Sequence, residues 1–159
     1  MKILGIDPGS GTIGFGVIKK NGRDYHPLEF GHIQTDKALS TARRLNELAD
    51  DLQTLITKHQ PDVCAVEELF FSKNVTTAIK VAQARGVILH TLAKSGYPIF
   101  EYNPLQIKVA ITGDGGADKK QVQKMVTLLL KLKNVPKPDD AADALAIALC
   151  HAHTAYQPT

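Results

Sequence analysis

The sequence predicts an α/β fold with a five-stranded mixed sheet, in which three antiparallel strands are followed by parallel additions and helices flank the sheet. Two observations support this prediction. Residues 1–35 contain three apolar, alternating stretches separated by turn residues. Two further apolar runs, 62–67 and 98–102, each follow a stretch with apolar residues at helical spacing. A helical crossover between two strands is the usual connection that makes them parallel.

The first predicted strand ends on an acid. Residues 3–6 suit a buried strand, and Pro8 and Gly9 end it directly after Asp7. This places the Asp7 carboxylate at the carboxyl end of a core strand, where open α/β sheets usually bind their ligands. An aspartate at this point can also simply begin a turn. Asp7 alone therefore leaves both interpretations open.

The next elements follow from local patterns. Residues 13–20 alternate as a second strand, Asn21 and Gly22 carry the signal of a type I′ hairpin, and 23–35 return as a third strand. A helix capped by Ser40 or Thr41 is expected to run to about His59. These assignments give an antiparallel meander followed by one amphipathic helix.

A second acid stands at the end of the fourth predicted strand. The run 62–67 suits a strand buried on both faces and parallel to the first, with Glu67 at its carboxyl end. Neighbouring parallel strands would bring Glu67 close to Asp7. Glu68 follows directly and points to the opposite face, so period-two alternation alone does not choose between the two glutamates.

A second long helix is predicted from Asn74 as its cap to Lys94, with Gly96 after its end. Its apolar residues surround more of the helix than one core contact requires. A partner subunit could cover the additional apolar face, and core packing on two sides is the alternative. The strand 98–102 follows, and Asn103 begins a short helix.

The stretch 108–137 is basic although the net charge of the whole chain is only +3. It contains a glycine-rich loop, 113–116, which we expect to be flexible, and a third long helix that begins at Ala117 or Asp118. The lysines of the stretch 108–137 are Lys108, Lys119, Lys120, Lys124, Lys131, Lys133 and Lys137. Such a run is either a solvated helix face or the binding surface for a polyanion.

The last predicted helix begins at Asp139. An acid at a helix amino terminus is usually a cap, which accounts for Asp139 but poorly for Asp143. Asp140 and Asp143 are three residues apart and share a face, and the alanines around them let this helix approach the sheet closely.

These carboxylates together predict a metal-dependent nuclease site. Asp7, Glu67, Asp140 and Asp143 would repel one another in a partly buried site, and a divalent cation resolves that conflict. All-oxygen ligands suit Mg²⁺, with Mn²⁺ as a substitute. Two such ions roughly 4 Å apart stabilise both the attacking and the leaving oxygen of a phosphoryl displacement. The expected substrate is a phosphodiester.

Length and composition limit the remaining possibilities. The 159 residues suit one domain, 1–153, with a disordered tail at 154–159. The chain carries no apolar run long enough for a membrane span and no signal peptide pattern, so we expect a cytoplasmic protein. Cys64 and Cys150 lie in apolar runs and are expected to be reduced core residues.

Four separated motifs resemble those of the RuvC family of bacterial crossover junction endodeoxyribonucleases. They are Ile-Leu-Gly-Ile-Asp7-Pro-Gly, Ala-Val-Glu67-Glu-Leu-Phe70-Phe-Ser-Lys73-Asn, Gln-Ala-Arg85-Gly and Asp140-Ala-Ala-Asp143-Ala-Leu-Ala-Ile-Ala. The resemblance covers nearly the whole chain. It implies an RNase H-like fold and a symmetric homodimer that resolves Holliday junctions, in recombination and repair, by Mg²⁺-dependent nicking of two strands of like polarity.

The resemblance also implies roles for individual residues. It makes Asp7, Glu67, Asp140 and Asp143 the catalytic and metal-binding carboxylates, and it chooses Glu67 over Glu68. It implies that Phe70 stacks against unpaired bases. It also implies that the branch-migration proteins RuvA and RuvB are partners. With the basic stretch included, the expected DNA-binding residues are Phe70, Lys73, Arg85, Lys108, Lys119 and Lys120.

Two other functions fit parts of the sequence. The run Gly5-Ile-Asp7-Pro-Gly9 with Gly11 also resembles the phosphate-binding hairpin of actin-like and sugar-kinase-like ATPases, but no second aspartate-glycine phosphate loop follows. A junction-binding module without cleavage could use the basic stretch alone. Four intact carboxylates argue against that module, because acids beside a DNA backbone weaken binding unless a metal is present.

Overall fold

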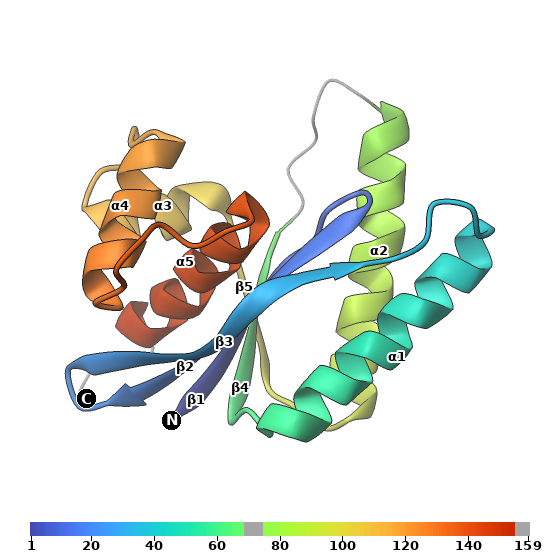
Figure 1. Cartoon of the computed structure of the whole chain (residues 1–159), viewed down its shortest axis with the longest axis horizontal. Coiled ribbons are helices and arrows are strands. Elements are labelled where there is room, and N and C mark those ends of the chain that lie inside the picture. The colour runs from blue at the N-terminus through green and yellow to red at the C-terminus, as the bar shows by residue number, and fades with distance from the viewer. Residues whose placement is uncertain (69–74, 155–159) are drawn as a thin grey trace.

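The computed structural model describes residues 1–68 and 75–154, and its strands form a five-stranded sheet in the order β3-β2-β1-β4-β5 (Figure 1). The strands are β1 (Lys2–Asp7), β2 (Thr12–Asn21), β3 (Asp24–Gln34), β4 (Val63–Glu67) and β5 (Ile99–Tyr102). β1, β2 and β3 pair antiparallel, whereas β4 joins β1 and β5 joins β4 in parallel. The predicted mixed sheet is confirmed.

Helices cover both faces of the sheet (Figure 1). They are α1 (Thr41–His59), α2 (Val75–Lys94), α3 (Pro104–Thr112), α4 (Lys119–Leu129) and α5 (Asp139–Thr154). Alternate residues of β1 serve the two faces: Leu4 packs in the cluster with α1 and α2, and Ile3 packs in the cluster with α3, α4 and α5. Asp7 has the parity of Ile3 and therefore belongs to the α5 face.

Polar caps fix where the helices begin. Ser40 accepts a hydrogen bond from the Arg43 backbone N–H and caps α1. Asn103 and Asp118 each form a reciprocal capping box, at the starts of α3 and α4 respectively. These starts agree with the sequence patterns, because a cap depends only on residues within one turn.

Glycines let α5 lie directly against the sheet. A Cβ atom added at Gly5 would lie 2.1 Å from the carbonyl oxygen of Ala144, and one added at Gly14 would lie 2.0 Å from that of Asp140. Both distances are far below a van der Waals contact, so only glycine fits at these two strand positions. The backbone of α5, alanine-rich and almost fully buried, thus lies against β1 and β2.

Two local predictions need adjustment. The predicted type I′ turn is wrong, because Asn21 pairs with Asp24 and the turn residues are Gly22 and Arg23, of which only Gly22 has a positive φ, at 59°. This pattern is typical of a type II′ turn. At the other end of the chain, α5 continues to Thr154, whose hydroxyl donates a hydrogen bond to Tyr102 Oη at 3.1 Å.

Two further expectations concern the interior and the membrane. Cys64 and Cys150 are both buried free thiols, as predicted, and burial raises the pKa of each to about 12. None of the helices within residues 1–68 and 75–154 combines the length and apolar character that crossing a membrane requires.

Candidate active site and metal centre

Two neighbouring strands end in acids on the same edge of the sheet. β1 and β4 are parallel, with Ile6 opposite Val66, so Asp7 and Glu67 follow at adjacent carboxyl ends. Glu67 is half-buried, whereas Glu68 is exposed and its backbone N–H donates to the carbonyl of Tyr102. The structure therefore places Glu67, and not Glu68, beside Asp7.

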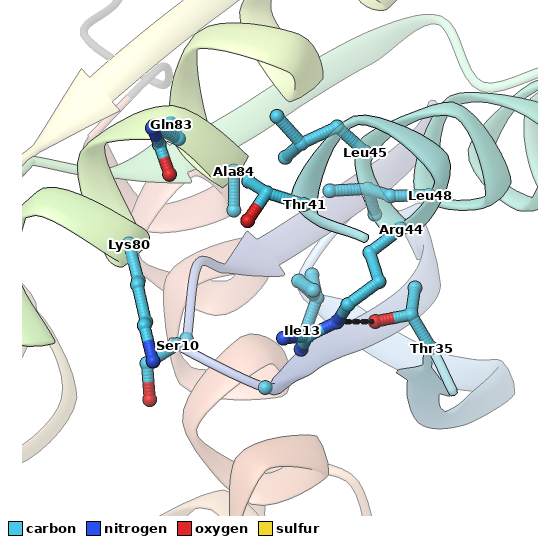
Figure 2. A pocket seen from close by; sticks show the side chains of 12 residues that line it. Ser10, Ile13, Thr35, Thr41, Arg44, Leu45, Leu48, Lys80, Gln83 and Ala84 are labelled. Atoms are coloured by element: carbon cyan, nitrogen blue, oxygen red, sulfur yellow. Dashed lines mark hydrogen bonds between the residues drawn. The ribbon is translucent and has the colours of Figure 1, made fainter. Parts of the chain in front are cut away.

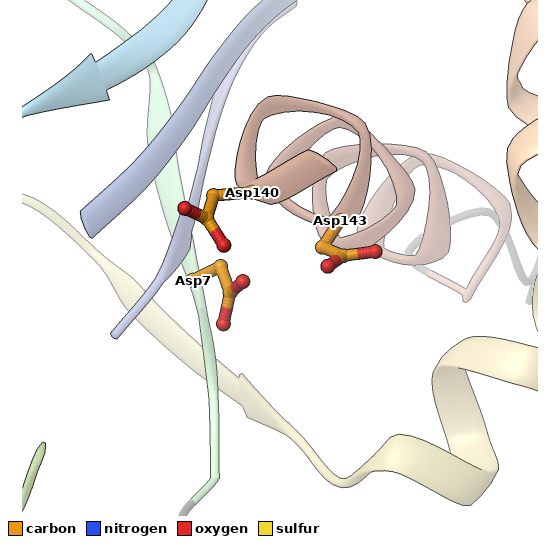
Figure 3. A group of neighbouring side chains, drawn as sticks. All are labelled: Asp7, Asp140 and Asp143. Atoms are coloured by element: carbon orange, nitrogen blue, oxygen red, sulfur yellow. The ribbon is translucent and has the colours of Figure 1, made fainter. Parts of the chain in front are cut away.

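The first turn of α5 brings two more carboxylates to this edge (Figure 3). Carboxylate oxygens of Asp7, Asp140 and Asp143 all lie within 4.8 Å of one another, and the three residues are half-buried. Asp139 is exposed and its Oδ1 accepts a hydrogen bond from Lys137 Nζ at 3.0 Å. The cluster thus joins β1 to α5, with Glu67 of β4 beside Asp7 and Asp139 at its margin.

Burial and crowding raise the pKa values of Asp7, Glu67 and Asp143. Burial is the largest cause that raises the pKa of Asp7, to about 8, followed by repulsion from Glu67 and Asp143. The side chains of Asp7 and Glu67 also share a hydrogen bond, which contributes to the raised pKa of Asp7. Burial also raises the pKa values of Glu67 and Asp143 above their ordinary range.

Two lysines enter the same site from α3 and α4. Lys108 and Lys119 line a pocket of about 250 Å³ together with Asp7, Glu67 and Asp143. Lys119 Nζ lies 3.0 Å from Asp143 Oδ2, and this hydrogen bond is the main cause that raises the pKa of the lysine. The pocket therefore combines a group of carboxylates with two lysines whose long side chains can reach a phosphate.

The residues at the edge of β1 fit a divalent cation. Their donors are carboxylate oxygens with no histidine or thiol among them, which is the ligand set of Mg²⁺, Mn²⁺ and Ca²⁺. After burial, repulsion from Glu67 and Asp143 is the next cause that raises the pKa of Asp7. A cation bound there would relieve that repulsion.

Among the other predicted DNA-binding residues, the structure describes Arg85 and Lys120, and neither lines the acidic pocket. Arg85 donates from Nε to the Glu67 carbonyl at 3.1 Å and pairs with Glu101, so it braces the end of β4 rather than lining the pocket. Lys120 is exposed beside Lys119 and does not line the pocket either. Phe70 and Lys73 lie outside the described residues.

Sequence patterns did not single out two further cations, Arg44 and Lys80, which line a second pocket beside the loop after β1 (Figure 2). Arg44 precedes the buried Leu48 by four residues and therefore lies on the inward face of α1. A cation at the end of an apolar helix face is the signal that could have identified Arg44. Lys80 carries no comparable signal, because exposed lysines are common on helices.

The comparisons with known proteins agree with one another. A family model described as crossover junction endodeoxyribonuclease RuvC matches residues 3–151. A protein of that name from Brevibacillus brevis is 53% identical over 152 residues, which are 96% of this chain and 92% of the relative. Another of that name, from Chloroflexus aggregans, is 52% identical over 155 residues, covering 98% of this chain and 94% of the relative.

A solved structure extends the agreement to three dimensions. Thermus thermophilus RuvC in complex with a Holliday junction substrate superposes with a TM-score of 0.92 at 36% identity, covering 98% of this chain and 94% of that one. Family model, relatives and structure thus all match across nearly the whole length, including β1, β4 and α5, which carry the acids. The chain belongs to the RuvC family of crossover junction endodeoxyribonucleases, with the RNase H-like fold of that family.

Proposed function

We propose that Asp7, Glu67, Asp140 and Asp143 form the catalytic centre with which this chain resolves Holliday junctions, by nicking two strands of like polarity. The observation that carries this proposal is the meeting of the Asp7, Asp140 and Asp143 oxygens within 4.8 Å on rigid core elements. The RuvC from T. thermophilus, whose solved complex contains a Holliday junction substrate, supports the choice of DNA.

The four carboxylates hold Mg²⁺, with Mn²⁺ as a substitute and two ions per site. Bound at this position, the ions supply a water of lowered pKa and neutralise charge on the reacting phosphate. Lys119 exchanges its contact with Asp143 for the phosphate oxygens, where charge develops, and Lys108 approaches from α3. The products are a 5′-phosphate and a 3′-hydroxyl.

A homodimer supplies the second cut. The outer face of α2 carries exposed apolar and small residues at helical spacing, with Val75 69% and Ile79 55% exposed and Ala82 and Gly86 following along the helix. An added Cβ at Gly86 meets nothing within 4 Å, so another helix has room to approach closely. A second copy packing here presents two identical sites to a junction of approximate two-fold symmetry.

The branch-migration proteins RuvA and RuvB complete the proposed assembly, on the grounds of family resemblance. Co-sedimentation of the chain with RuvA bound to a four-way junction is the expected result, and no co-sedimentation would contradict this part of the proposal.

Cleavage of a synthetic four-way junction tests the proposed function. The purified chain is incubated with end-labelled junction or linear duplex, in Mg²⁺, Mn²⁺ or chelator, and strand lengths are read on a denaturing gel. We expect symmetric nicks in the junction with either metal, and no nicks in the presence of the chelator. T4 DNA ligase should reseal the products, because ligation requires a 5′-phosphate and a 3′-hydroxyl.

Matched variants identify the residues responsible. Asp7→Asn should abolish cutting while junction binding persists, whereas Asp51→Asn, an exposed acid on α1, should cut like the wild type. Cutting by Asp7→Asn would contradict the proposed site. Junction binding without cuts by the wild-type chain in metal would instead favour the non-cleaving junction binder.

A further inference from the structure

A second pocket is lined by Gly9, Ser10 and Gly11 of the loop that follows Asp7 (Figure 2). Its walls come from the β1–β2 loop, the end of β3, the first turns of α1 and the first half of α2. Arg44 extends from α1 toward Thr35, and Lys80 extends from α2 toward the loop (Figure 2). The hydroxyls of Ser10 and Thr41 also line it. This pocket shares no residue with the acidic one.

The charge of this pocket is uniformly positive. Its lining includes Arg44 and Lys80 but no aspartate or glutamate. Arg44 is half-buried, and its Nε donates a hydrogen bond at 3.1 Å to the hydroxyl of Thr35, which is only 5% exposed. Within residues 1–68 and 75–154, the ion pairs found involve neither Arg44 nor Lys80. A fixed guanidinium without a carboxylate partner is a site for an anion.

The size of the pocket selects the anion. Its free volume is about 40 Å³. That space holds a few atoms, whereas pockets for nucleotides or other small molecules measure roughly 300–1,000 Å³. A single phosphate group fits, with oxygens reaching the Arg44 guanidinium and the hydroxyls beside it. A complete nucleotide does not fit.

The position of the pocket selects the source of that phosphate. Ser10 follows Asp7 by three residues, which span at most about 10 Å even when fully extended. Phosphates follow one another every 3.4 Å or so along the axis of one DNA strand. A strand that has its scissile phosphate at Asp7 and runs toward the β1–β2 loop carries other phosphates past that loop.

We propose that the pocket between the β1–β2 loop and helices α1 and α2 binds a backbone phosphate of the cut strand, within about three nucleotides of the scissile phosphate. Arg44 makes the fixed contact and Lys80 adds a mobile one. This proposal deepens the proposed function and rests on it, because the acidic site defines which strand is being cut. Contacts at two phosphates of one strand, one at the acidic site and one in this pocket, would fix the direction of the strand across the active site.

Charge-matched variants test the pocket. Arg44→Gln and Lys80→Gln each remove one positive charge from it, and Arg43→Gln and Lys94→Gln remove one from exposed positions on the same helices, outside the pocket. Affinity for a labelled four-way junction is measured in chelator between about 50 and 200 mM salt. Melting curves by circular dichroism show whether each variant is folded. Lys80 is exposed, so its variant stays informative even if Arg44→Gln does not fold.

The expected result separates the two pairs. Arg44→Gln should weaken junction binding about tenfold, because it removes charge-assisted hydrogen bonds. Lys80→Gln should weaken binding roughly threefold, as expected for an exposed cation. The double variant should reduce the slope of log affinity against log salt by about one. Equal losses in Arg43→Gln and Lys94→Gln would overturn the proposal, since net charge alone would then explain the effect.

Junctions with one uncharged backbone linkage identify the phosphate that the pocket binds. Junctions carrying one methylphosphonate at successive positions near the cut are bound by wild type and by Arg44→Gln. We expect one position at which the neutral linkage weakens wild-type binding but leaves Arg44→Gln unaffected. The absence of any such position within about three nucleotides of the cut would overturn the proposal.

Two further measurements distinguish a DNA phosphate site from a nucleotide site, and failure of this proposal from failure of the proposed function. Thermal stabilisation of the wild type by ATP, lost in Arg44→Gln, would make the pocket a nucleotide site and overturn the DNA assignment. Cleavage is assayed in the same preparations. One outcome is that the wild type binds the junction more tightly than the Arg44 and Lys80 variants, as predicted, and yet never cuts it in metal. In that case the pocket proposal stands for DNA binding, while the proposed catalytic function fails.

Discussion

Asp7 is a strained carboxylate in the metal-free protein. Its pKa in the folded chain is raised to about 8 from 3.8, with burial as the largest cause. Between these two values the folded state retains a proton that the unfolded state has lost. The free energy of unfolding of the metal-free chain should therefore fall as pH rises from about 4 to about 8, which is the sign that proton linkage requires for a raised carboxyl pKa.

The Asp7→Asn variant isolates this effect from other titrations. In chelator at about pH 8, where about half of wild-type Asp7 is ionised, the variant should melt about 2–6 °C above the wild type. At about pH 5 the gap should shrink, because the folded wild type is then protonated and loses less by linkage. Melting curves at both pH values measure the gap. A variant that is less stable at both would show that the acids do not strain the fold.

Lys119 differs from its neighbour Lys120 in what it contacts. Lys119 lies in the acidic pocket against Asp143, and Lys120 is exposed outside it. Lys119→Gln should reduce the single-turnover cleavage rate about 10²-fold or more, since it removes the charge that we propose stabilises the reacting phosphate. Lys120→Gln should keep the rate and weaken junction affinity only slightly. Equal rates for both variants would remove Lys119 from the reaction.

At the scale of elements, the contact between β2 and α5 is the one that positions Asp140. Gly14→Ala would drive a methyl group into the Asp140 carbonyl, which lies 2.0 Å from the ideal Cβ position. The variant should lose about 1–3 kcal/mol of stability and most of its cleavage, as the first turn of α5 moves off the sheet. Thermal melts and junction cleavage measure the two effects.

Gly31→Ala is the matched control on β3. Its added methyl would meet only ring atoms of Phe15, at 3.3 Å, and a side chain yields more easily than backbone. We expect a loss below about 1 kcal/mol and normal cleavage. Equal damage from the two alanines would mean that general strand disruption, and not the approach of α5, is responsible.

The elements themselves were largely predictable, and the exceptions share a cause. Caps such as Asn103 and Asp118 act within one turn, so sequence alone locates them. The pairing of Arg85 with Glu101 joins α2 to β5, and no local pattern announces it. The hairpin at Gly22 was assigned the wrong turn type because the pairing of Asn21 with Asp24 places the turn one residue later.

The candidate site was predictable to the extent that it depends on strand order. Parallel pairing of β1 with β4 follows from a helical crossover, and it brings Asp7 and Glu67 together. The contact of Lys119 with Asp143 depends on how α4 packs against α5, which periodicity does not specify. Arg44 joined no motif, since its partner Thr35 lies on another element.

At the scale of the whole molecule, paired cutting should require two intact sites. Mixed dimers of wild-type and Asp7→Asn chains, isolated with two different affinity tags, should nick one strand of a junction and leave its counterpart whole. Denaturing gels with both strands labelled distinguish single from paired nicks. Paired nicks from a mixed dimer would show that one site cuts both strands.

The proposed dimer surface on α2 has its own test. Ile79→Glu places a charge on the exposed apolar face of α2 and should shift the chain to monomers in sedimentation equilibrium. Its nicks in the two strands should then become uncoupled in time. Lys94→Glu, at the far end of the same helix, should leave the oligomeric state unchanged. An Ile79→Glu chain that sediments like wild type would place the interface elsewhere.

The burial of α5 determines which partner in the complex has to deform. This helix carries Asp140 and Asp143 and is also the centre of the core, wedged against glycines on β1 and β2. Moving its acids toward a badly placed phosphate would mean breaking the best-packed part of the protein. We therefore expect the proposed site to keep its shape when DNA binds, and the DNA backbone to bend toward it. A branched junction bends more readily than linear duplex, so this rigidity would favour cutting of the junction.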